Sequence, residues 1–425
     1  MRVLVVGGGG REHALCWALA PSATVFCAPG NPGTADIATN LPASPDDHHA
    51  ILEAVNEHAI DLTVVGPEAP LAAGLVDHLS AAGRAAFGPS AAAARLEASK
   101  AFAKQVMEAA GVPTAVGRTF TDEAPALSYI GAHAEPLVVK ASGLAAGKGA
   151  IICATRTEAK DVARRMLRGG FGDAGREIVV EEFLDGEEVS LIGITDGERI
   201  AMLPPAQDHK RIGEGDTGPN TGGMGAYSPV TIATDALVDL MLRDVFQPVL
   251  AQLDSMGARY RGFLYAGIML TDSENPYVLE FNCRLGDPEA QVVLPLIGTG
   301  FAEHLWNIAT GARWHPPASL AAAHGAAVTT VLASAGYPAA ARKGDPITLP
   351  NRLPDQTILF HAGTARDPAG RLVTAGGRVL SATGLGPDVP AAAARSRALA
   401  EAIAFPGMVY RRDIAWREVA RAGAS

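Results

Sequence analysis

Glu280, Asn282 and Arg284 alternate within a segment that reads Val-Leu-Glu-Phe-Asn-Cys-Arg-Leu-Gly-Asp-Pro-Glu from position 278. Residues two apart on a β-strand point to the same face. Glu280 and Asn282 therefore offer two oxygen ligands side by side, which suits Mg²⁺ bridged to phosphate oxygens. Arg284 continues that face and could stabilise charge on a transferring phosphoryl group. An ion-paired surface strand is the simpler alternative, and the apolar neighbours of these residues speak against it.

A glycine-rich loop begins at Lys140 and reads Ala-Ser-Gly-Leu-Ala-Ala-Gly-Lys-Gly as far as Gly149. Apolar segments flank it, so we expect a loop between two strands, with small residues that suit a flap over a polyphosphate. Lys140, at the end of the first strand, could hold phosphate oxygens. The loop is not a Walker loop, because Lys148 is followed by glycine rather than by Ser or Thr and a helix. A plain β-hairpin with an exposed lysine is the alternative.

Four glycines, residues 7–10, stand between an expected first strand and a helix, and Arg11 and Glu12 follow them. Backbone N–H groups and the helix dipole favour an anion at such a place. The motif fails as a dinucleotide fingerprint, because position 12 is Glu and the second strand ends in Ala28-Pro29 without an acidic residue. We therefore favour a single phosphate beside Arg11, with a merely tight turn as the alternative.

Two further segments are suggestive only in combination. The strand that ends Val-Glu-Glu-Phe-Leu before Asp185 could read an adenine through its backbone, although acidic residues on strand edges are usually just solvated. The segment from Gln207 to Tyr227 is polar and rich in glycine. It predicts a loop that presents N–H groups and short side chains to a small polar substrate, with a disordered loop as the alternative.

The elements that must position these motifs alternate in type over the first hundred residues. Strand signals at 3–6, 24–27 and 61–65 are interleaved with helical signals at 12–19, 46–58 and 71–82. This pattern is typical of an open parallel α/β sheet. Ligands sit beyond the carboxyl ends of such strands, where the glycine and proline turns lie.

The rest of the chain predicts an α/β and α+β multidomain protein. A helix from about 90 to 110 precedes a boundary at Gly111-Val112-Pro113. We expect strands and one clear helix near 157–168, then a long helix near 235–257 and a strand pair at 262–270 and 277–281. A linker follows residue 311, and short strands with one late helix complete the chain. The predicted domains are 1–103, 104–195, 196–311 and 325–425.

Composition narrows the function classes. The 425 residues carry a net charge of −10 without a basic tract, which argues against nucleic acid as a partner. No apolar run reaches the roughly 18 residues of a membrane span, and the N-terminus lacks a signal-peptide pattern. The four cysteines are scattered, so a cytoplasmic protein is expected. Only seven of the 35 basic residues are lysine, so those in the glycine-rich segments attract attention.

Taken in order, the motifs resemble the phosphoribosylamine–glycine ligase family of the ATP-grasp superfamily. The matching segments are GGREHAL, APGN, VGPEAPL, GPS, KASGLAAGKG, EEFLDGEE, QDHKR, DTGPNTGGMGAYSP, GFLYAG, EFNCRLGDPE, FHAGT and GGRVL. The sequence departs from the family pattern at Gly8, where relatives often carry Asn or Ser, and at Leu285, where Phe is common. The first departure puts one side-chain hydrogen bond to a phosphate in doubt.

The resemblance implies a Rossmann-like N-terminal domain, a two-subdomain ATP-grasp core and a small β-rich C-terminal domain. It implies that ATP, glycine and 5-phosphoribosylamine react through a glycyl phosphate to give glycinamide ribonucleotide, with Mg²⁺ or Mn²⁺ as cofactor. Phosphoribosylamine would be bound by Gly9, Gly10, Arg11, Asn31, Pro67 and Glu68. ATP would be bound by Lys100, Lys140, Gly143, Gly147, Lys148, Glu181, Phe183, Leu184 and Glu188. The metal would be held by Glu280 and Asn282. The further substrate-binding residues would be Asp208, Thr221, Gly222, Gly223, Met224, Arg284, Asp287 and Glu289, of which Arg284 and Asp287 would be catalytic together with Lys140.

Two other functions remain open at this level. Another ATP-grasp ligase would act on a different acid and amine, and a non-catalytic phosphosugar or nucleotide sensor would bind ligands without forming ADP. The Glu-x-Asn-x-Arg pattern at 280–284 speaks against a sensor. We expect a monomer or weak homodimer that binds small molecules and neither nucleic acid nor membranes.

Overall fold

The N-terminal region is an open parallel sheet in the order β3-β2-β1-β4-β5. The computed structural model describes residues 1–145, 149–271, 275–317, 319–321 and 325–424. The strands are β1 (Arg2–Gly7), β2 (Thr24–Pro29), β3 (Thr39–Asn40), β4 (Leu62–Val65) and β5 (Ala85–Phe87). The connecting helices are α1 (Gly10–Leu19), η1 (Thr34–Asp36), α2 (His48–Glu57), α3 (Glu68–Ala72) and α4 (Leu75–Ala81). The predicted parallel sheet is confirmed, but the helix expected at 71–82 is divided before Gly74, whose φ of 87° no helix contains.

The helix expected from 90 to 110 is two helices, α5 (Ala91–Ala98) and α6 (Lys100–Ala110). Ser99 separates them with an extended backbone, and its hydroxyl accepts a hydrogen bond from the N–H of Phe102 (3.1 Å). This is an N-cap, which stabilises the start of a helix. The break places Lys100 at the first position of α6.

A four-stranded antiparallel sheet follows, in the order β6-β9-β7-β8. Its elements are β6 (Gly117–Phe120), α7 (Glu123–Ala132), β7 (Leu137–Ala141), β8 (Ala150–Cys153), α8 (Arg156–Arg165), η2 (Met166–Gly170), η3 (Gly172–Gly175) and β9 (Ile178–Glu182). Helix α7 was not expected. It fully buries only Ala126 and Ile130, so its apolar periodicity is weak, and Pro125 is tolerated because it lies in the first turn.

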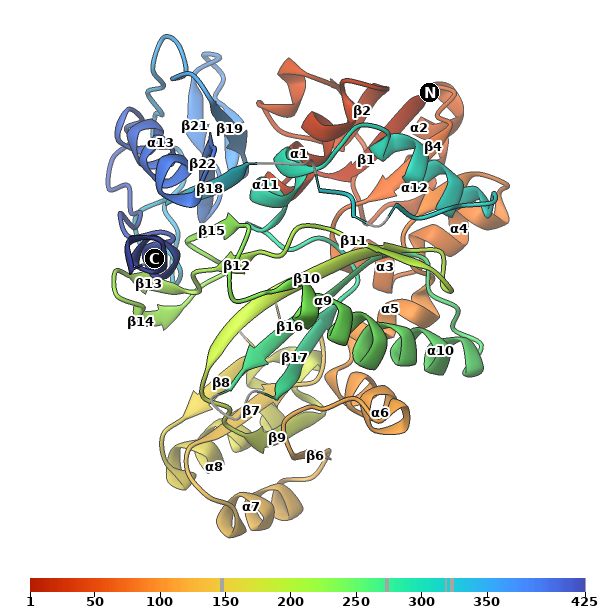
Figure 1. Cartoon of the computed structure of the whole chain (residues 1–425), viewed down its shortest axis with the longest axis vertical. Coiled ribbons are helices and arrows are strands. Elements are labelled where there is room, and N and C mark those ends of the chain that lie inside the picture. Colours follow the sequence, from red (N-terminus) through yellow and green to blue (C-terminus); the bar gives the residue numbers. More distant parts are fainter. Residues whose placement is uncertain (146–148, 272–274, 318, 322–324, 425) are drawn as a thin grey trace.

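The central antiparallel sheet has the order β11-β10-β16-β17 and confirms the predicted strand pair. The strands are β10 (Glu187–Thr195), β11 (Ile200–Met202), β16 (Gly262–Leu270) and β17 (Pro276–Asn282). Helices α9 (Asp235–Met241), η4 (Leu242–Phe246) and α10 (Gln247–Ser255) run beside this sheet, as Figure 1 shows. The chain then forms α11 (Ala290–Val293), η5 (Leu294–Leu296) and α12 (Phe301–Thr310).

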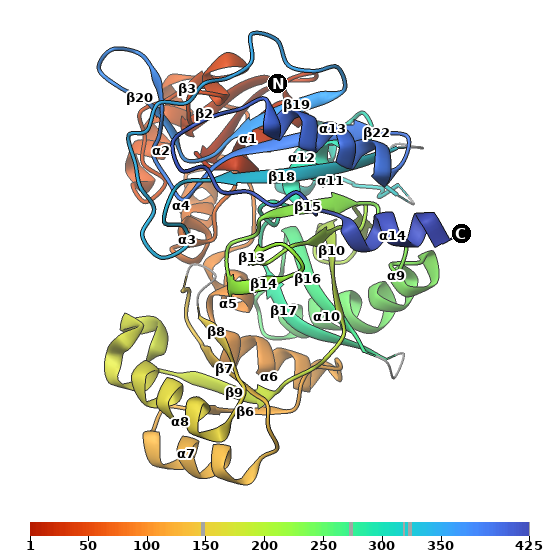
Figure 2. The same cartoon turned by 90° about the vertical axis from the view of Figure 1, so that its left-hand side faces the viewer.

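The last sheet combines strands that lie far apart in the sequence, in the order β12-β15-β18-β22-β19 (Figure 2). Two come from the middle of the chain, β12 (Gln207–Asp208) and β15 (Gly225–Ser228), and three from its end, β18 (Ala326–Ala333), β19 (Thr357–His361) and β22 (Arg378–Gly386). Two hairpins accompany it, β13 (Arg211–Gly213) with β14 (Thr217–Asn220) and β20 (Thr364–Arg366) with β21 (Leu372–Thr374). The C-terminal part has two helices, α13 (Val389–Glu401) and α14 (Trp416–Ala424), where one was expected.

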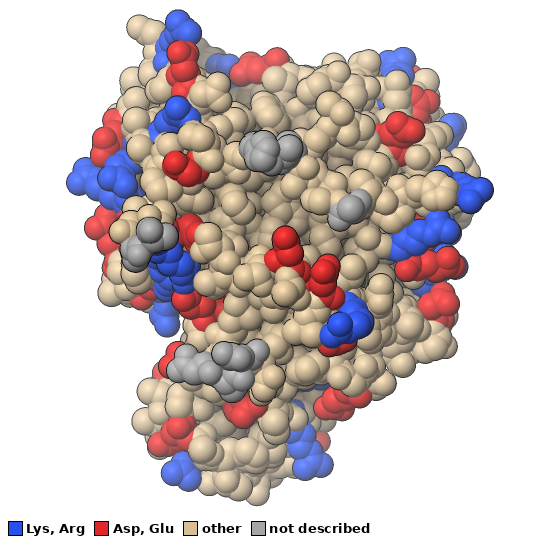
Figure 3. Space-filling view, viewed as in Figure 1, with Lys and Arg blue, Asp and Glu red and all other residues tan. Residues whose placement is uncertain are grey.

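On the face drawn in Figure 3, basic and acidic side chains lie side by side mainly around the margin, and the middle of the face is mostly free of them. Among the described residues, no helix has the length and apolar character needed to cross a membrane.

Candidate active site

A cavity of about 410 Å³ lies where the sheets and helices α5 and α6 meet. Its wall draws on segments spread over most of the chain. The charged lining residues are Arg11, Glu68, Glu97, Lys100, Lys104, Lys140, Glu181, Asp208, Lys210, Glu280, Arg284, Asp287, Glu289 and Arg378. The structure therefore brings together residues from the N-terminal, lysine-containing and Glu-x-Asn-x-Arg motifs.

Strand β17 presents Glu280 and Asn282 to this cavity, as the strand alternation predicted. Within the described residues, no hydrogen bond or ion pair occupies either side chain. Burial alone would raise the pKa of Glu280, but Lys210, Lys100 and Lys140 together lower it, so the carboxylate is ionised at neutral pH. An ionised carboxylate beside an amide oxygen fits a divalent ion that takes its other ligands from phosphates and water. The described residues hold no group of three or more His, Cys, Asp or Glu that would enclose a metal by themselves.

Two lysines, Lys100 and Lys140, line the same cavity as Glu280 and Asn282. Lys100 is fixed through its backbone, because its N–H donates to the carbonyl of Ser142 (2.8 Å). Burial lowers the pKa of Lys100, and Glu280 acts in the opposite direction. The ammonium of Lys140 pairs with Glu181 and donates to the carbonyl of Leu279 on β17 (3.2 Å).

Lys104 is a third lysine of this region, which sequence reasoning missed. Its Nζ lies 3.1 Å from Glu181 Oε2 and 3.0 Å from Thr114 Oγ1. Glu181 is thus held between Lys104 and Lys140. The scarcity of lysine and the four-residue spacing from Lys100, one helical turn, were the available signals.

Arg284 joins the N-terminal motif to β17. Its Nη2 lies 2.8 Å from Glu97 Oε1, and its Nε lies 3.3 Å from Glu68 Oε2. Arg11 approaches the same Glu68 oxygen at 3.8 Å and donates to the carbonyl of Gly66 (2.7 Å). Burial would raise the pKa of Glu68, but Arg284 and Arg11 lower it. The two arginines and Glu68, predicted from separate motifs, therefore form one charged wall.

The glycine turn after β1 borders this wall rather than lining the cavity. A Cβ on Gly9 would lie 3.9 Å from Asp287 Oδ2, and one on Gly10 would meet Gln291. Glu12 Oε2 accepts the N–H of Gly9 (2.6 Å), which sequence reasoning did not anticipate. The carboxylate of Glu12 thus lies at the helix N-terminus, where a phosphate was expected.

Asn31 and Pro67 also lie outside the cavity lining. Both amide hydrogens of Asn31 are donated to carbonyls, one to Gly8 (3.0 Å) and one to His361 (2.9 Å). Asn31 thereby ties the glycine turn to the C-terminal sheet. Pro67 is the N-cap residue of α3, directly before Glu68.

The end of β12 contributes Asp208 to the cavity, and the segment that follows contributes Lys210, Thr221 and Gly222. Burial raises the pKa of Asp208, while the ammonium of Lys210 opposes this shift; Lys210 itself pairs with Glu188. Gly223 and Met224 do not line the cavity. Gly223 packs against Pro288, and Met224 is fully buried.

Of the remaining predicted residues, some line the cavity and others lie outside it. Glu289 lines the cavity and accepts from Ser190 Oγ (3.2 Å). Gly143, Phe183, Leu184 and Glu188 lie outside the lining, although Leu144, Ala145 and Gly149 of the glycine-rich loop are part of it. Gly147 and Lys148 lie outside the described residues.

Arg378 reaches the cavity from β22 and was not predicted. Its Nη2 lies 3.2 Å from Asp287 Oδ2, and its Nη1 donates to the carbonyls of Asp287 and Gly222. Arg378 lies in the GGRVL segment near the end of the chain, but nothing in the sequence of that segment predicts that its arginine lines a cavity. Arg378 therefore connects the C-terminal sheet to two candidate substrate-binding positions.

Comparison with known proteins shows the family to which the chain is related. Profiles of phosphoribosylglycinamide synthetase match its N domain at residues 1–97, its ATP-grasp (A) domain at 98–290 and its C domain at 327–417. A phosphoribosylamine–glycine ligase of Nostoc sp. is 48% identical over 98% of this chain and 99% of its own length. The crystal structure of phosphoribosylamine–glycine ligase from Thermotoga maritima aligns with a TM-score of 0.85 at 36% identity, covering 97% of this chain and all of that one. A biotin carboxylase from Campylobacter jejuni shares the fold, with a TM-score of 0.71 at 15% identity over 97% of this chain and 93% of that one. The chain belongs to the phosphoribosylamine–glycine ligase family, also described as the phosphoribosylglycinamide synthetases.

Proposed function

We propose that this protein joins glycine to 5-phosphoribosylamine at the expense of ATP, giving glycinamide ribonucleotide, ADP and phosphate in de novo purine synthesis. The observation that carries the proposal is the convergence of Glu280, Asn282 and Arg284 with Lys100 and Lys140 in one cavity. Oxygen ligands and cations so arranged suit phosphoryl transfer to a carboxylate.

The chemistry explains why such a site is needed. A carboxylate does not acylate an amine, because its leaving group is poor. Transfer of the γ-phosphoryl group to the glycine carboxylate creates an acyl phosphate, which the amine of phosphoribosylamine attacks with release of phosphate. The protein's task is to position the reactants and to offset the charge of two anions brought together.

We assign the roles as follows. Glu280 and Asn282 would hold the divalent ion, Mg²⁺ or Mn²⁺, which would supply positive charge to the phosphate oxygens. Lys100 and Lys140 contact the ATP phosphates, and Arg284 stabilises charge on the transferring group. Asp287 faces the amine, between Arg378 and the glycine turn. Of the glycine-rich loop, the described residues Leu144, Ala145 and Gly149 line the cavity and would help to exclude water from the acyl phosphate, while residues 146–148 lie outside the described residues.

The decisive experiment measures ADP release with ATP, Mg²⁺ and glycine, with and without phosphoribosylamine formed in situ from ribose 5-phosphate and ammonia. Turnover that requires both substrates supports the ligase. ADP release with a different acid would assign the chain to another ATP-grasp reaction, and ATP binding without any ADP would favour a sensor.

The predicted domain limits, the cytoplasmic location and a monomeric or weakly dimeric state belong to the same proposal. Light scattering over a concentration series tests the oligomeric state. Limited proteolysis tests whether cleavage falls near residues 104, 196 and 311–325.

A further inference from the structure

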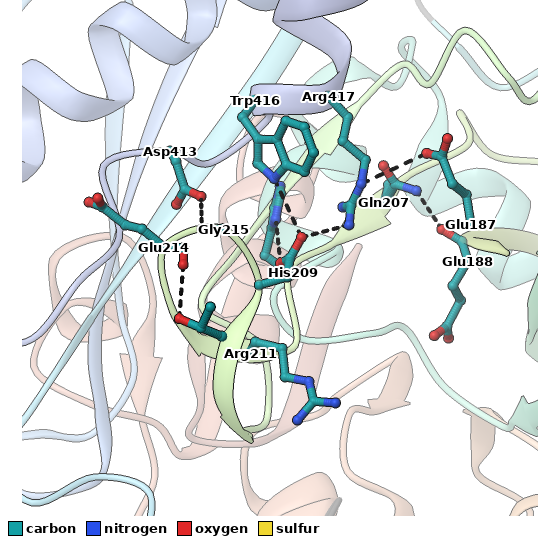
Figure 4. Close-up of polar contacts among 12 residues, drawn as sticks. Glu187, Glu188, Gln207, His209, Arg211, Glu214, Gly215, Asp413, Trp416 and Arg417 are labelled. Carbon is teal, nitrogen blue, oxygen red and sulfur yellow. Dashed lines mark hydrogen bonds and ion pairs between the residues drawn. The ribbon is translucent and has the colours of Figure 1, made fainter. Parts of the chain in front are cut away.

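The segment from Arg411 to Arg417, which leads into α14, packs against the hairpin loop that follows β12 (Figure 4). Asp208, the last residue of β12, and Lys210, at the start of that loop, both line the cavity. His209 stands between them and is buried on the opposite side, with 1% of its surface exposed. Because neighbouring residues of an extended chain point to opposite faces, whatever fixes His209 also orients Asp208 and Lys210.

The ring of His209 is hydrogen-bonded through Nε2, while Nδ1 has no hydrogen-bond partner among the described residues. Its Nε2 accepts a hydrogen bond from the N–H of Ala415 (2.9 Å), so in the neutral ring the proton is assigned to Nδ1. Nδ1 faces Asp216 Oδ1 at 3.5 Å. Burial lowers the pKa of His209, which keeps the ring neutral and Nε2 able to accept. The imidazole thus bridges the C-terminal segment and the β13–β14 hairpin.

Asp216 forms ion pairs with two arginines of the C-terminal segment. Its carboxylate lies 2.7 Å from Arg411 Nη1 and 2.6 Å from Arg417 Nη2, and Trp416 Nε1 lies at 3.4 Å. The backbone of Asp216 has a φ of 55°, which is uncommon for a residue other than glycine and costs free energy. The ion pairs therefore hold a hairpin conformation that is unfavourable in isolation.

Arg411 is the centre of this arrangement. Only 1% of its surface is exposed, although it is an arginine. Its guanidinium also contacts Asp413 through Nε and Nη2, both at 2.7 Å, and the carbonyl of Arg211 at 3.2 Å. Asp413 in turn accepts the N–H of Gly215 (2.8 Å). A planar, bidentate group with five donors suits these contacts, and a lysine would not replace it.

The two cavity-facing side chains meet opposite electrostatic forces, because the surrounding carboxylates attract Lys210 and oppose the ionisation of Asp208. Asp208 lies in the field of Glu289, Glu188 and Glu280, which oppose its ionisation, and Lys210 alone compensates on the loop. We propose that residues 411–417 act as a positioning element for the ligase reaction, and that Arg411 and His209 are positioning residues that hold Asp208 and Lys210 toward the reacting groups. This inference rests on the proposed function.

Two substitutions of His209 separate the contacts. In His209→Gln, the side-chain oxygen can reach the place of Nε2 and accept from Ala415. In His209→Asn, the shorter side chain reaches only the place of Nδ1, so the contact with Ala415 is lost. We expect His209→Asn and Arg411→Met to lower kcat/KM for glycine and phosphoribosylamine by ~10- to 100-fold, as misplaced reactants do. We expect MgATP affinity to change less than about threefold and His209→Gln to retain most of the activity.

Arg412→Gln is the matched control, because Arg412 lies in the same segment but its exposed side chain approaches Glu401 and not the β13–β14 hairpin. It should leave all kinetic constants at wild-type values. Parallel losses of MgATP affinity, kcat/KM and Tm in His209→Asn and Arg411→Met would show a merely structural role and overturn the proposal. Unchanged kinetics in both folded variants would overturn it as well.

Hydrogen exchange keeps the test independent of the assigned reaction. Amides of residues 208–216 should exchange at least about tenfold faster in Arg411→Met than in wild type and Arg412→Gln. If wild type shows no ADP release with glycine and phosphoribosylamine, the proposed function fails even when the loop is anchored. If exchange is unchanged, the positioning element fails whatever the reaction is.

Discussion

The carboxylate of Glu97 lies 2.8 Å from the guanidinium of Arg284, and its other oxygen accepts the N–H of Cys283 (2.7 Å). One side chain at the end of α5 thus holds both the backbone and the cationic group that follow β17. Lys100 lies three residues further along the chain, at the start of α6. Glu97 therefore couples the expected positions of two cations that act on the phosphates.

Replacing Glu97 by Gln should lower kcat by about tenfold or more. The amide can still accept from Cys283, but it no longer pairs with Arg284, and hydrogen bonds to charged groups contribute roughly 1.5–3 kcal/mol. Steady-state kinetics and a thermal melt measure both consequences. Glu53→Gln, at an exposed position of α2, is the control. A Glu97→Gln enzyme with wild-type kcat would mean that Arg284 needs no such partner.

Glu280→Ala should abolish turnover and leave the fold intact. The substitution removes the ionised oxygen ligand that the metal requires, while the cavity remains open to solvent and ligands. Turnover and the Mg²⁺ dependence of ATP binding are the measurements. Glu198→Ala removes a surface ion pair with Arg259 and should have little effect. Near-normal kcat in Glu280→Ala would refute the metal role.

Arg378→Met should raise KM for phosphoribosylamine by ~10-fold and leave MgATP affinity nearly unchanged. The guanidinium holds Asp287 and the carbonyl of Gly222, which border the substrate side of the cavity. Losing a charged contact of this kind costs about 1.5–3 kcal/mol. Arg371→Met, whose side chain is exposed beside Asp367, provides the control. An equal loss of MgATP affinity would indicate that Arg378 supports the general stability of the protein and has no specific role in binding phosphoribosylamine.

Acid should destabilise the contact between the N-terminal and C-terminal sheets. His13 Nδ1 accepts the N–H of His361 (2.8 Å), so the imidazole of His13 must be unprotonated there. Burial lowers the pKa of His13 to about 3 and that of His361 to about 4, from 6.5. Below pH 6.5 the unfolded chain therefore binds protons that the folded chain excludes. Each such histidine lowers the free energy of unfolding by up to about 1.4 kcal/mol per pH unit, until its folded pKa is reached.

Thermal melts between pH 7.5 and 4.5 test this prediction. His13→Asn keeps an oxygen acceptor for His361 and cannot be protonated in this range, so its Tm should fall less steeply with pH. Identical slopes for wild type and His13→Asn would exclude His13 as a source of the acid sensitivity.

Local periodicity made part of this molecule predictable. The alternation at Glu280 and Asn282 gives their shared face in any strand, and the glycine turn after β1 follows from composition. The break at Ser99 was not predictable, because the alanine-rich sequence on both sides continues a helix and serine is a weak signal. Asn31 was assigned to the phosphoribosylamine site through the family resemblance alone, and its hydrogen bonds to the carbonyls of Gly8 and His361 join segments that the sequence does not show to be close.

Contacts between distant segments were beyond sequence reasoning. Arg411 meets Asp216 across 195 positions, and Arg378 meets the carbonyl of Asp287 across 91. Neither pair has a spacing that encodes proximity. The charged residues are visible in the sequence, but their segments meet only through the tertiary fold, which includes the pairing of β15 with β18 and of β18 with β22.

The pairing of β12, β15 and β18 also bears on the order in which parts of the enzyme can fold during synthesis on the ribosome. Strand β15, which also pairs with β12, leaves the ribosomal tunnel about a hundred residues before its partner β18, and Arg378 emerges later still. Domains fold as units during synthesis, so the parallel sheet and the two four-stranded sheets can form before the last sheet is complete. A chain released before β22 would contain Lys100, Lys140 and Glu280 yet lack Arg378, which holds Asp287 and the carbonyl of Gly222. Prematurely terminated products would therefore carry the residues assigned to ATP and the metal without this link between the C-terminal sheet and the cavity.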